Sequence, residues 1–191
     1  MSFAIRFHQT GGPEVLRWEE VPVGDPAADE VRIRHEAVGL NYIDTYQRSG
    51  LYPLPLPSGL GQEGAGVVEA VGKEVRDFRP GDRVAYAGGP VGAYSQQRCL
   101  PAARLLKLPE SIDFRSGAAM MLQGLTTAYL LRRTYAVQPG DAVLIHAAAG
   151  GVGLIACQWA RALGATVIGT VSTEAKAELA RQHGCEHVIL Y

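Results

Sequence analysis

Apolar and polar residues alternate in short runs from the N-terminus to about Leu108, and glycine and proline separate the runs. Alternation with a period of two, bounded by turn residues, is typical of β-strands with one buried face. We expect strands at Phe3–Phe7, Val15–Glu19, Val31–Val38, Val67–Val71, Arg83–Tyr86 and Ala93–Leu100. One interruption, Asn41–Gln47, is expected to form a helical turn. The first part of the chain is therefore predicted to be a mostly-β, barrel-like domain.

The pattern changes at Ser111. Ser111–Tyr135 carries alanine, leucine and methionine at helical spacing, and a break or bend is expected around Gly124. The remaining elements are expected in the order Ala142–His146 (strand), a helix to Leu163 capped by Gly164, Ala165–Val171 (strand), Thr173–His183 (helix) and His187–Leu190 (strand). This alternation is typical of a parallel sheet with right-handed crossovers. We expect a β domain over residues 1–122 and an α/β domain over residues 123–191.

The composition excludes several classes of function. Eighteen basic and 19 acidic residues give a formal charge of -1, without a basic run, so neither nucleic acid nor an anionic membrane is an expected partner. No apolar stretch reaches the length of a membrane span, and the N-terminal residues do not resemble a signal peptide. Three cysteines without CxxC spacing predict neither a disulfide framework nor a zinc knuckle. These features favour a cytoplasmic protein.

The sequence Ala147–Gly153 is the strongest candidate for a binding site. Its last six residues follow the pattern G-x-G-x-x-G with Ala148 at the first position, between a predicted strand and a predicted helix. In that context Ala149, Gly150, Gly151 and Val152 are expected to bind a pyrophosphate, since helix N-terminal amides attract anions. The alternative is a glycine turn that serves only tight packing.

The residues after the second strand of the α/β domain favour NADPH over NADH. NAD sites usually carry an acidic residue there, whereas this chain has Ser172 and then Thr173. A serine hydroxyl can donate to a 2′-phosphate, and the ammonium of Lys176, one turn later, can bind the same group. Glu174 opposes this interpretation unless it is simply an acidic first-turn residue. The alternative for Lys176 is a solvated helix lysine.

Four stretches together resemble bacterial quinone oxidoreductases: Asn41–Tyr46, Arg48–Tyr52, Gly61–Gly66 and Ala147–Gly153. These enzymes form the zeta-crystallin-like branch of the medium-chain dehydrogenase/reductase superfamily. The resemblance implies a GroES-like β-barrel domain followed by a Rossmann domain. It also implies NADPH as hydride donor, small quinones as substrates and a homodimer for the full-length form.

The resemblance implies an enzyme without zinc. Zinc-dependent relatives carry a Gly-His-Glu motif with a ligating histidine, but this chain has Gln62 at that position and Asn41 where a ligating cysteine is expected. Without a Lewis acid, alcohol oxidation loses its means of lowering the hydroxyl pKa. A quinone is already electrophilic, so its reduction needs mainly alignment with the nicotinamide.

The resemblance also assigns site residues. It places four near the nicotinamide end of the cofactor: Asn41, Tyr46, Gln62 and Thr126. Tyr46 and Tyr52 are candidate donors to a quinone carbonyl, the alternative being ordinary half-buried aromatic residues. Gln123 is a further catalytic candidate in the segment between the domains. Tyr191 is expected to contact the adenosine half of the cofactor.

The family is considerably longer than this chain, which supplies only the first half of a Rossmann fold. We therefore expect a C-terminally truncated form whose strand Ala142–His146 lies at an open sheet edge. Two functions remain as alternatives to quinone reduction: an NADPH-dependent enoyl or alkenal reductase, and a non-catalytic nucleotide-binding fragment.

Overall fold

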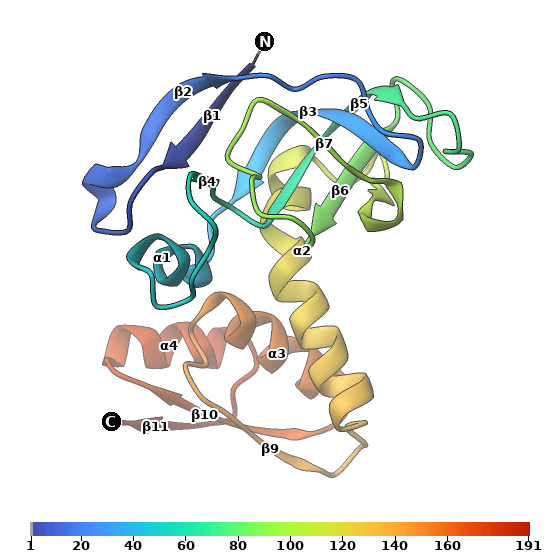
Figure 1. Ribbon diagram of the computed structural model, residues 1–191. Helices are drawn as coiled ribbons and strands as arrows, with labels where there is room; N and C mark the ends of the chain where they lie inside the picture. The colour runs from blue at the N-terminus through green and yellow to red at the C-terminus, as the bar shows by residue number, and fades with distance from the viewer. Residues whose placement is uncertain (1) are drawn as a thin grey trace. The chain divides into compact units, whose positions relative to one another are not determined.

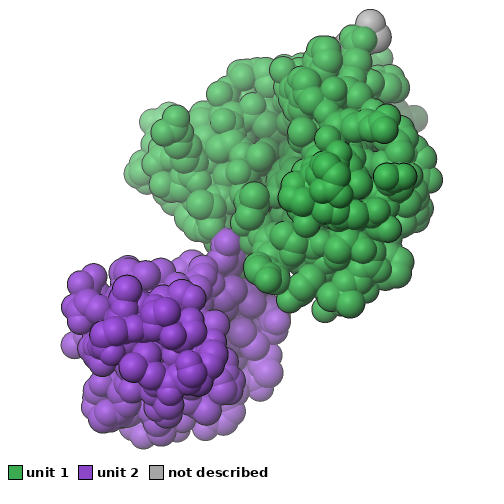
Figure 2. Space-filling view, turned by 90° about the vertical axis from the view of Figure 1, so that its left-hand side faces the viewer, with its two compact units in different colours: residues 1–122 green, residues 123–191 purple. Residues whose placement is uncertain are grey.

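The computed structural model describes residues 2–191 and separates the chain between Leu122 and Gln123 into two units. Figure 2 shows residues 1–122 (unit 1) in green and residues 123–191 (unit 2) in purple. Unit 1 contains antiparallel sheets, whereas the sheet of unit 2 is parallel. No helix among residues 2–191 combines the length and the apolar character needed to cross a lipid bilayer.

Unit 1 is built on two antiparallel sheets rather than one closed ladder (Figure 1). The first has the order β2-β1-β4, with β1 Ser2–Phe7, β2 Arg17–Val21 and β4 Ser58–Gly59. The second has the order β7-β3-β5-β6-β8, with β3 Glu30–Gly39, β5 Glu63–Val71, β6 Arg83–Ala87, β7 Gln97–Pro101 and β8 Leu106–Lys107. A bridge between Ala4 and Ser95 links β1 to the segment before β7. Short 3₁₀ helices lie at Pro13–Val15 and Ala102–Arg104.

The core of unit 1 follows from the alternation along β3. Val31 and Ile33 are fully buried and pack with residues of β5, β6 and β7 around them: Val68, Val84, Tyr86 and Leu100. Gly66 on β5 lets the two central strands approach closely, since a Cβ there would lie 2.0 Å from the carbonyl oxygen of Arg34. The alternating pattern of the sequence therefore corresponds to one buried face of the five-stranded sheet.

The helix expected after β3 is present as α1, Tyr42–Ser49. At its start the carboxylate of Asp44 accepts a hydrogen bond from the backbone amide of Asn41 at 2.9 Å, as in a capping box. At its end Gly50 has a φ of 87°, a left-handed conformation that glycine adopts without strain. Local capping thus determines both ends of α1.

Helix α2, Phe114–Tyr129, differs from the expectation at Gly124. The helix continues through this residue without a break and passes into a π-helical segment, Leu130–Thr134. Glycine lowers helix stability by about 1 kcal/mol relative to alanine but does not remove a backbone hydrogen bond. Of the two alternatives expected at Gly124, a break or a bend, the break is therefore wrong, because a single glycine is tolerated inside a long helix.

Unit 2 has the predicted order of strands and helices. Its sheet has the order β11-β10-β9, all parallel, with β9 Ala142–Ile145, β10 Thr166–Val171 and β11 His187–Leu190. Helices α3 (Gly151–Ala162) and α4 (Glu174–Gln182) lie on one face of this sheet (Figure 1). Gly164, with a φ of 85°, follows α3 as expected for a C-terminal cap. The chain is thus a mostly-β unit followed by an α/β unit with a three-stranded parallel sheet, as expected.

Candidate functional site

The turn between β9 and α3 brings the backbone of the strand end against the start of the helix. Gly150 is extended, with φ and ψ of -84° and 173°, and precedes the first helical residue. A Cβ on Gly153 would lie 2.4 Å from the carbonyl oxygen of Ala147 and 2.7 Å from the carbonyl carbon of Ala148. Only glycine at position 153 allows α3 to lie this close to the turn.

The N-terminus of α3 supplies amides for an anion. The amide of Leu154 donates to the carbonyl of Gly150 at 2.9 Å, which begins the helical ladder. The amides of Gly151, Val152 and Gly153 precede that bond and point out of the helix end, where the helix dipole also favours negative charge. The amides of Gly151 and Val152, two of the predicted pyrophosphate-binding residues, therefore have no acceptor within the helix, as an anion site requires.

A pocket of about 120 Å³ in unit 2 gathers most of the predicted cofactor residues. It is lined by Ala147, Ala149, Gly150, Val171, Ser172, Lys176 and Tyr191. The ammonium of Lys176 lies 3.1 Å from the hydroxyl oxygen of Ser172, so both groups face the same side of the pocket. Glu174 instead forms an ion pair with Arg181 at 3.0 Å.

Gln123 also lies at the glycine turn. A Cβ on Gly151 would lie 3.1 Å from Cγ of Gln123, which places this side chain against the start of α3. The hydroxyl of Thr127 donates to the backbone carbonyl of Gln123 at 2.9 Å, while Thr126 is half-buried on the same helix. Unit 2 thus groups Gln123 with the glycine turn and the pocket residues.

In unit 1, Asn41 belongs to a buried polar network. Its side-chain amide donates to Glu63 at 2.6 Å, and the other carboxylate oxygen of Glu63 accepts from the backbone amide of Leu122 at 2.7 Å. Asp44 accepts from the Asn41 backbone amide and from the hydroxyl of Tyr94, the latter at 2.7 Å. Burial raises the pKa of Glu63, and the hydrogen bonds from Leu122 and Asn41 oppose that shift.

Sequence reasoning missed Glu63 as a functional residue. The signal was present, since Glu63 follows Gln62 directly in the Gly61–Gly66 stretch. Glu63 begins β5 and is followed by five glycine, alanine and valine residues, and an acidic residue in such surroundings predicts a buried polar interaction. Its partners, however, lie 22 and 59 residues away along the chain, so no local pattern identifies them.

The two tyrosines predicted for acceptor binding are in contact. The ring of Tyr46 lies edge-on to Tyr52, with centroids 5.4 Å apart, and edge-on to Tyr42 at 5.2 Å. Tyr52 is 51% exposed and Tyr42 is 74% exposed. Gln62 is half-buried, and its backbone carbonyl accepts from the amide of Gly88 at 2.9 Å. Unit 1 therefore presents an aromatic surface made of three tyrosines on and after α1.

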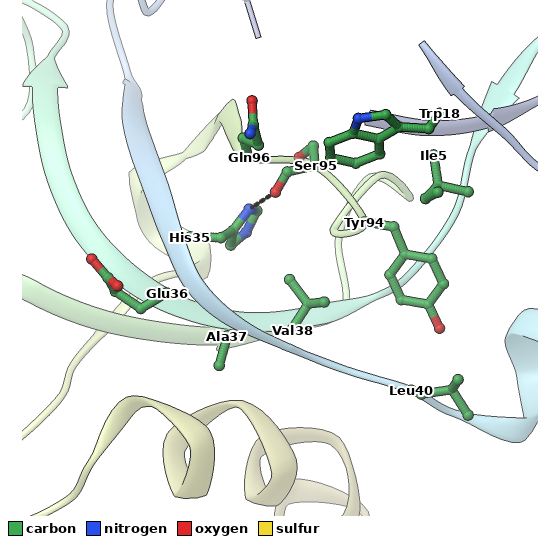
Figure 3. Close-up of a pocket in the computed structure, with 10 residues that line it drawn as sticks. All are labelled: Ile5, Trp18, His35, Glu36, Ala37, Val38, Leu40, Tyr94, Ser95 and Gln96. Carbon is green, nitrogen blue, oxygen red and sulfur yellow. Dashed lines mark hydrogen bonds between the residues drawn. The ribbon is translucent and has the colours of Figure 1, made fainter. Parts of the chain in front are cut away.

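A larger hollow, in unit 1, does not involve the predicted residues. It measures about 500 Å³ and is mostly apolar, with Trp18, Val38, Leu40 and Tyr94 among its lining residues (Figure 3). None of the ten residues labelled in Figure 3 is a site residue predicted from the sequence. Tyr94 connects this pocket to the network, because its hydroxyl donates to Asp44.

Comparison with known proteins yields two matching family models and many relatives. Residues 27–110 match the alcohol dehydrogenase GroES-like domain, and residues 151–191 match the zinc-binding dehydrogenase family. A quinone oxidoreductase of Pseudomonas aeruginosa is 60% identical over the whole chain, and a 2-haloacrylate reductase of a Burkholderia species is 52% identical. The structure of the Escherichia coli quinone oxidoreductase complexed with NADPH has a TM-score of 0.97 and 53% identity, covering 99% of this chain and 58% of that one.

The name of the second family model implies zinc, but the residues present do not fit it. Structural and catalytic zinc sites use cysteine, histidine and carboxylate ligands in a tetrahedral arrangement. Over residues 2–191 no group of three or more such side chains could hold a metal ion. Asn41, at the position expected for a ligand, instead donates its amide to Glu63. The polar groups at this site therefore bind each other and do not form a ligand set.

The matched residues agree with the two units. Residues 27–110 contain β3, β5, β6, β7 and β8 of unit 1, and residues 151–191 run from α3 to β11 of unit 2. The chain spans 59% of the length of the curated quinone oxidoreductases of Pseudomonas aeruginosa and Escherichia coli. The alignment with both covers the whole of this chain. Over its whole length the chain is therefore similar to quinone oxidoreductases, and it carries the matches to the alcohol dehydrogenase GroES-like domain and the zinc-binding dehydrogenase family in that order.

Proposed function

We propose that the chain binds NADPH at the glycine turn and is the cofactor- and acceptor-binding part of an enzyme that reduces quinones by hydride transfer without zinc. The single observation that carries the proposal is the pocket in unit 2, which joins Gly150 to Ser172 and Lys176. In this proposal the glycine turn binds the pyrophosphate of the cofactor, and Ser172 and Lys176 bind its 2′-phosphate. The complex of the Escherichia coli relative with NADPH supports the same assignment.

The pyrophosphate is expected at the start of α3. Amides of Gly151 and Val152 donate to its oxygens, and Gly150 lets the backbone approach without a side chain in the way. The adenosine half lies along Ala149 and Tyr191, which line the same pocket. The amides at the start of α3 are already held in place by the helix, so they require little ordering on binding.

The 2′-phosphate is expected beside Ser172 and Lys176. The ammonium of Lys176 has a neutral hydroxyl as its hydrogen-bond partner, and Glu174 is paired with Arg181 instead. A carboxylate at this position would repel the phosphate, whereas these groups attract it. Charge-assisted hydrogen bonds contribute about 1.5–3 kcal/mol, and the exposure of Lys176 favours the lower end of that range.

When bound, NADPH supplies the hydride for reduction. Asn41, Gln62, Gln123 and Thr126 are proposed to bind and orient the nicotinamide end. The hydroxyl groups of Tyr46 and Tyr52 are proposed to donate hydrogen bonds to a quinone carbonyl oxygen as negative charge develops there. The contact between the two rings holds both phenols on one surface. Because a quinone is already electrophilic, this alignment requires no metal.

The substitution Lys176→Ala tests the cofactor assignment. We expect the Kd for NADPH to rise about 10-fold, which corresponds to about 1.4 kcal/mol, and the Kd for NADH to change less than twofold. Fluorescence titration of the 191-residue chain measures both constants. Arg161→Ala, which removes one positive charge near the other end of α3, serves as the matched control. Equal losses for both nucleotides would contradict the role of Lys176.

A second candidate function is reduction of an activated C=C bond. The observation in its favour is the 52% identity to a 2-haloacrylate reductase. Both reactions use the same donor and the same phosphate-binding residues, so the acceptor distinguishes them. Turnover by the 191-residue chain with benzoquinone, naphthoquinone and unsaturated aldehydes or acids measures the preference. NADPH that binds but is not oxidised with any acceptor would make the chain a nucleotide-binding module.

A further inference from the structure

Glu63 is a buried carboxylate whose two oxygens both accept hydrogen bonds from nitrogen. The residue is fully buried, and none of the ion pairs found among residues 2–191 involves it. One oxygen accepts from the side-chain amide of Asn41 at 2.6 Å and the other from the backbone amide of Leu122 at 2.7 Å. A buried charge is costly unless it is hydrogen-bonded, so these two donors are what make the carboxylate tolerable.

The backbone around Glu63 leaves room for this arrangement. Gly39 at the end of β3 is opposite Glu63 in the β3–β5 ladder. A Cβ on Gly39 would lie 2.3 Å from the carboxylate oxygen that binds Asn41. Any side chain at position 39 would therefore displace the carboxylate. A glycine in the ladder interior weakens a strand, and here it permits a close side-chain approach.

Asn41 is held on two sides. Its side-chain amide is bound by Glu63, and its backbone amide is bound by Asp44, which is 3% exposed. Asp44 is held in turn by the hydroxyl of Tyr94, and burial together with that bond raises the pKa of Tyr94. The orientation of the Asn41 side chain therefore depends on a rigid, buried set of acceptors.

Glu63 also binds the backbone of α2, through the amide of Leu122. Leu122 is the last residue of unit 1 and immediately precedes Gln123. A hydrogen bond from its backbone to Glu63 fixes the helix at this point relative to β5. One carboxylate thus holds a residue before α1 and a residue within α2.

We propose that Glu63 is a positioning residue, whose carboxylate fixes the Asn41 side chain and the α2 backbone beside Gln123 in the geometry that acceptor reduction requires. This inference rests on the proposed function for the roles of Asn41 and Gln123. Both partners of Glu63 are donors, so the site needs two acceptors at position 63. Glutamine has nearly the same shape but would turn an N–H group toward one of the two donors.

The substitution Glu63→Gln tests the role, with Glu69→Gln as a matched control on the same strand. Glu69 is half-buried and binds Gln97 and two arginines, away from Asn41. In the variant at position 63 we expect amide exchange at Leu122 or at the Asn41 side chain to become at least about 10-fold faster by NMR, because one acceptor is lost. With benzoquinone we expect kcat to fall on the order of 100-fold while the Kd for NADPH changes less than twofold. The control should retain wild-type values in each measurement.

A double variant that restores the hydrogen bonds distinguishes a positioning role of Glu63 from a general loss of structure. The double variant Asn41→Asp/Glu63→Gln exchanges donor and acceptor between the two positions and leaves an acceptor for Leu122. It should therefore recover slow exchange at the Leu122 amide. Should Glu63→Gln fail to fold, Glu63→Asp, which keeps the charge but is too short to reach both partners, must show the same accelerated exchange. Unchanged exchange and unchanged kcat in the position-63 variants would overturn the proposal.

The proposed function fails separately from this inference. If the wild-type chain does not bind NADPH, the cofactor assignment is wrong, whereas the exchange measurements need no nucleotide. If it binds NADPH without oxidising it, hydride transfer by this chain is excluded. In that case NADPH should still shift the Asn41 side-chain amide resonance in the wild type and the Glu69→Gln control but not in Glu63→Gln. Shifts that are identical in all three would overturn the positioning role.

Discussion

Acidification should destabilise unit 1 through His35. This residue lies on β3, where its Nδ1 is 2.7 Å from the backbone carbonyl oxygen of Ser95 and its Nε2 is 2.8 Å from the hydroxyl of Tyr86 (Figure 3 shows the Ser95 contact). The neutral ring satisfies both contacts by donating from Nδ1 and accepting at Nε2. Burial lowers the pKa of His35 to about 4; the Ser95 carbonyl opposes this shift and the positive charge of Arg98 adds to it.

The magnitude follows from the two states of the chain. The unfolded chain binds a proton at this histidine below about pH 6.5, and the folded chain does so only below about pH 4. The contribution to stability is therefore complete above pH 6.5 and is lost as the pH falls toward 4. At about 1.4 kcal/mol per pH unit, the whole loss is about 3 kcal/mol, and about 2 kcal/mol of it has occurred by pH 5.

Urea unfolding at pH 7.5 and pH 5.0 measures this effect. The chain contains two tryptophans, so the background Trp159→Phe leaves Trp18 as the fluorescent reporter of unit 1. His35→Gln lowers the free energy of unfolding at both pH values. The difference in this free energy between pH 7.5 and pH 5.0 should be about 2 kcal/mol smaller in the variant than in the wild type. His187→Gln, at an exposed histidine, is the control for losing a histidine elsewhere. Parallel pH profiles for the wild type and His35→Gln would refute the reasoning.

Two further predictions concern unit 2. Gly153→Ala should weaken NADPH binding at least about 10-fold and lower Tm, because the added Cβ would lie 2.4 Å from the Ala147 carbonyl oxygen and push α3 from the turn. Gly124→Ala should raise the free energy of unfolding by about 0.5–1 kcal/mol, because no atom lies within 4 Å of the added Cβ. Calorimetry that shows equal effects of the two substitutions would contradict this account. Sedimentation velocity should show self-association of the chain through the open edge of β9, reduced by Leu144→Lys, since lysine on an edge strand opposes pairing. A wild-type chain that remains monomeric at about 100 µM would argue against the edge as an adhesive surface.

Local signals in the sequence determined the order of elements in unit 2. The glycines of the Ala147–Gly153 turn and the hydroxyl of Thr173, which caps α4, act over a few residues. The same is true of α1, whose capping box and terminal Gly50 lie within ten residues of each other. Interactions of this range leave a pattern along the chain, which is why strands, helices and the glycine turn before α3 were predictable.

Only the tertiary structure decided which groups meet. Glu63 binds residues 22 and 59 positions away, and that meeting depends on the register of β5 against β3 and on the path of α2. The continuous α2 through Gly124 likewise reflects the whole helix rather than one residue. In unit 2, Glu174 pairs with Arg181 and Lys176 with Ser172, and the sequence alone did not assign either partner. Long-range contacts leave no periodic trace along the chain, because their cost in chain entropy is offset only once the entire fold is formed.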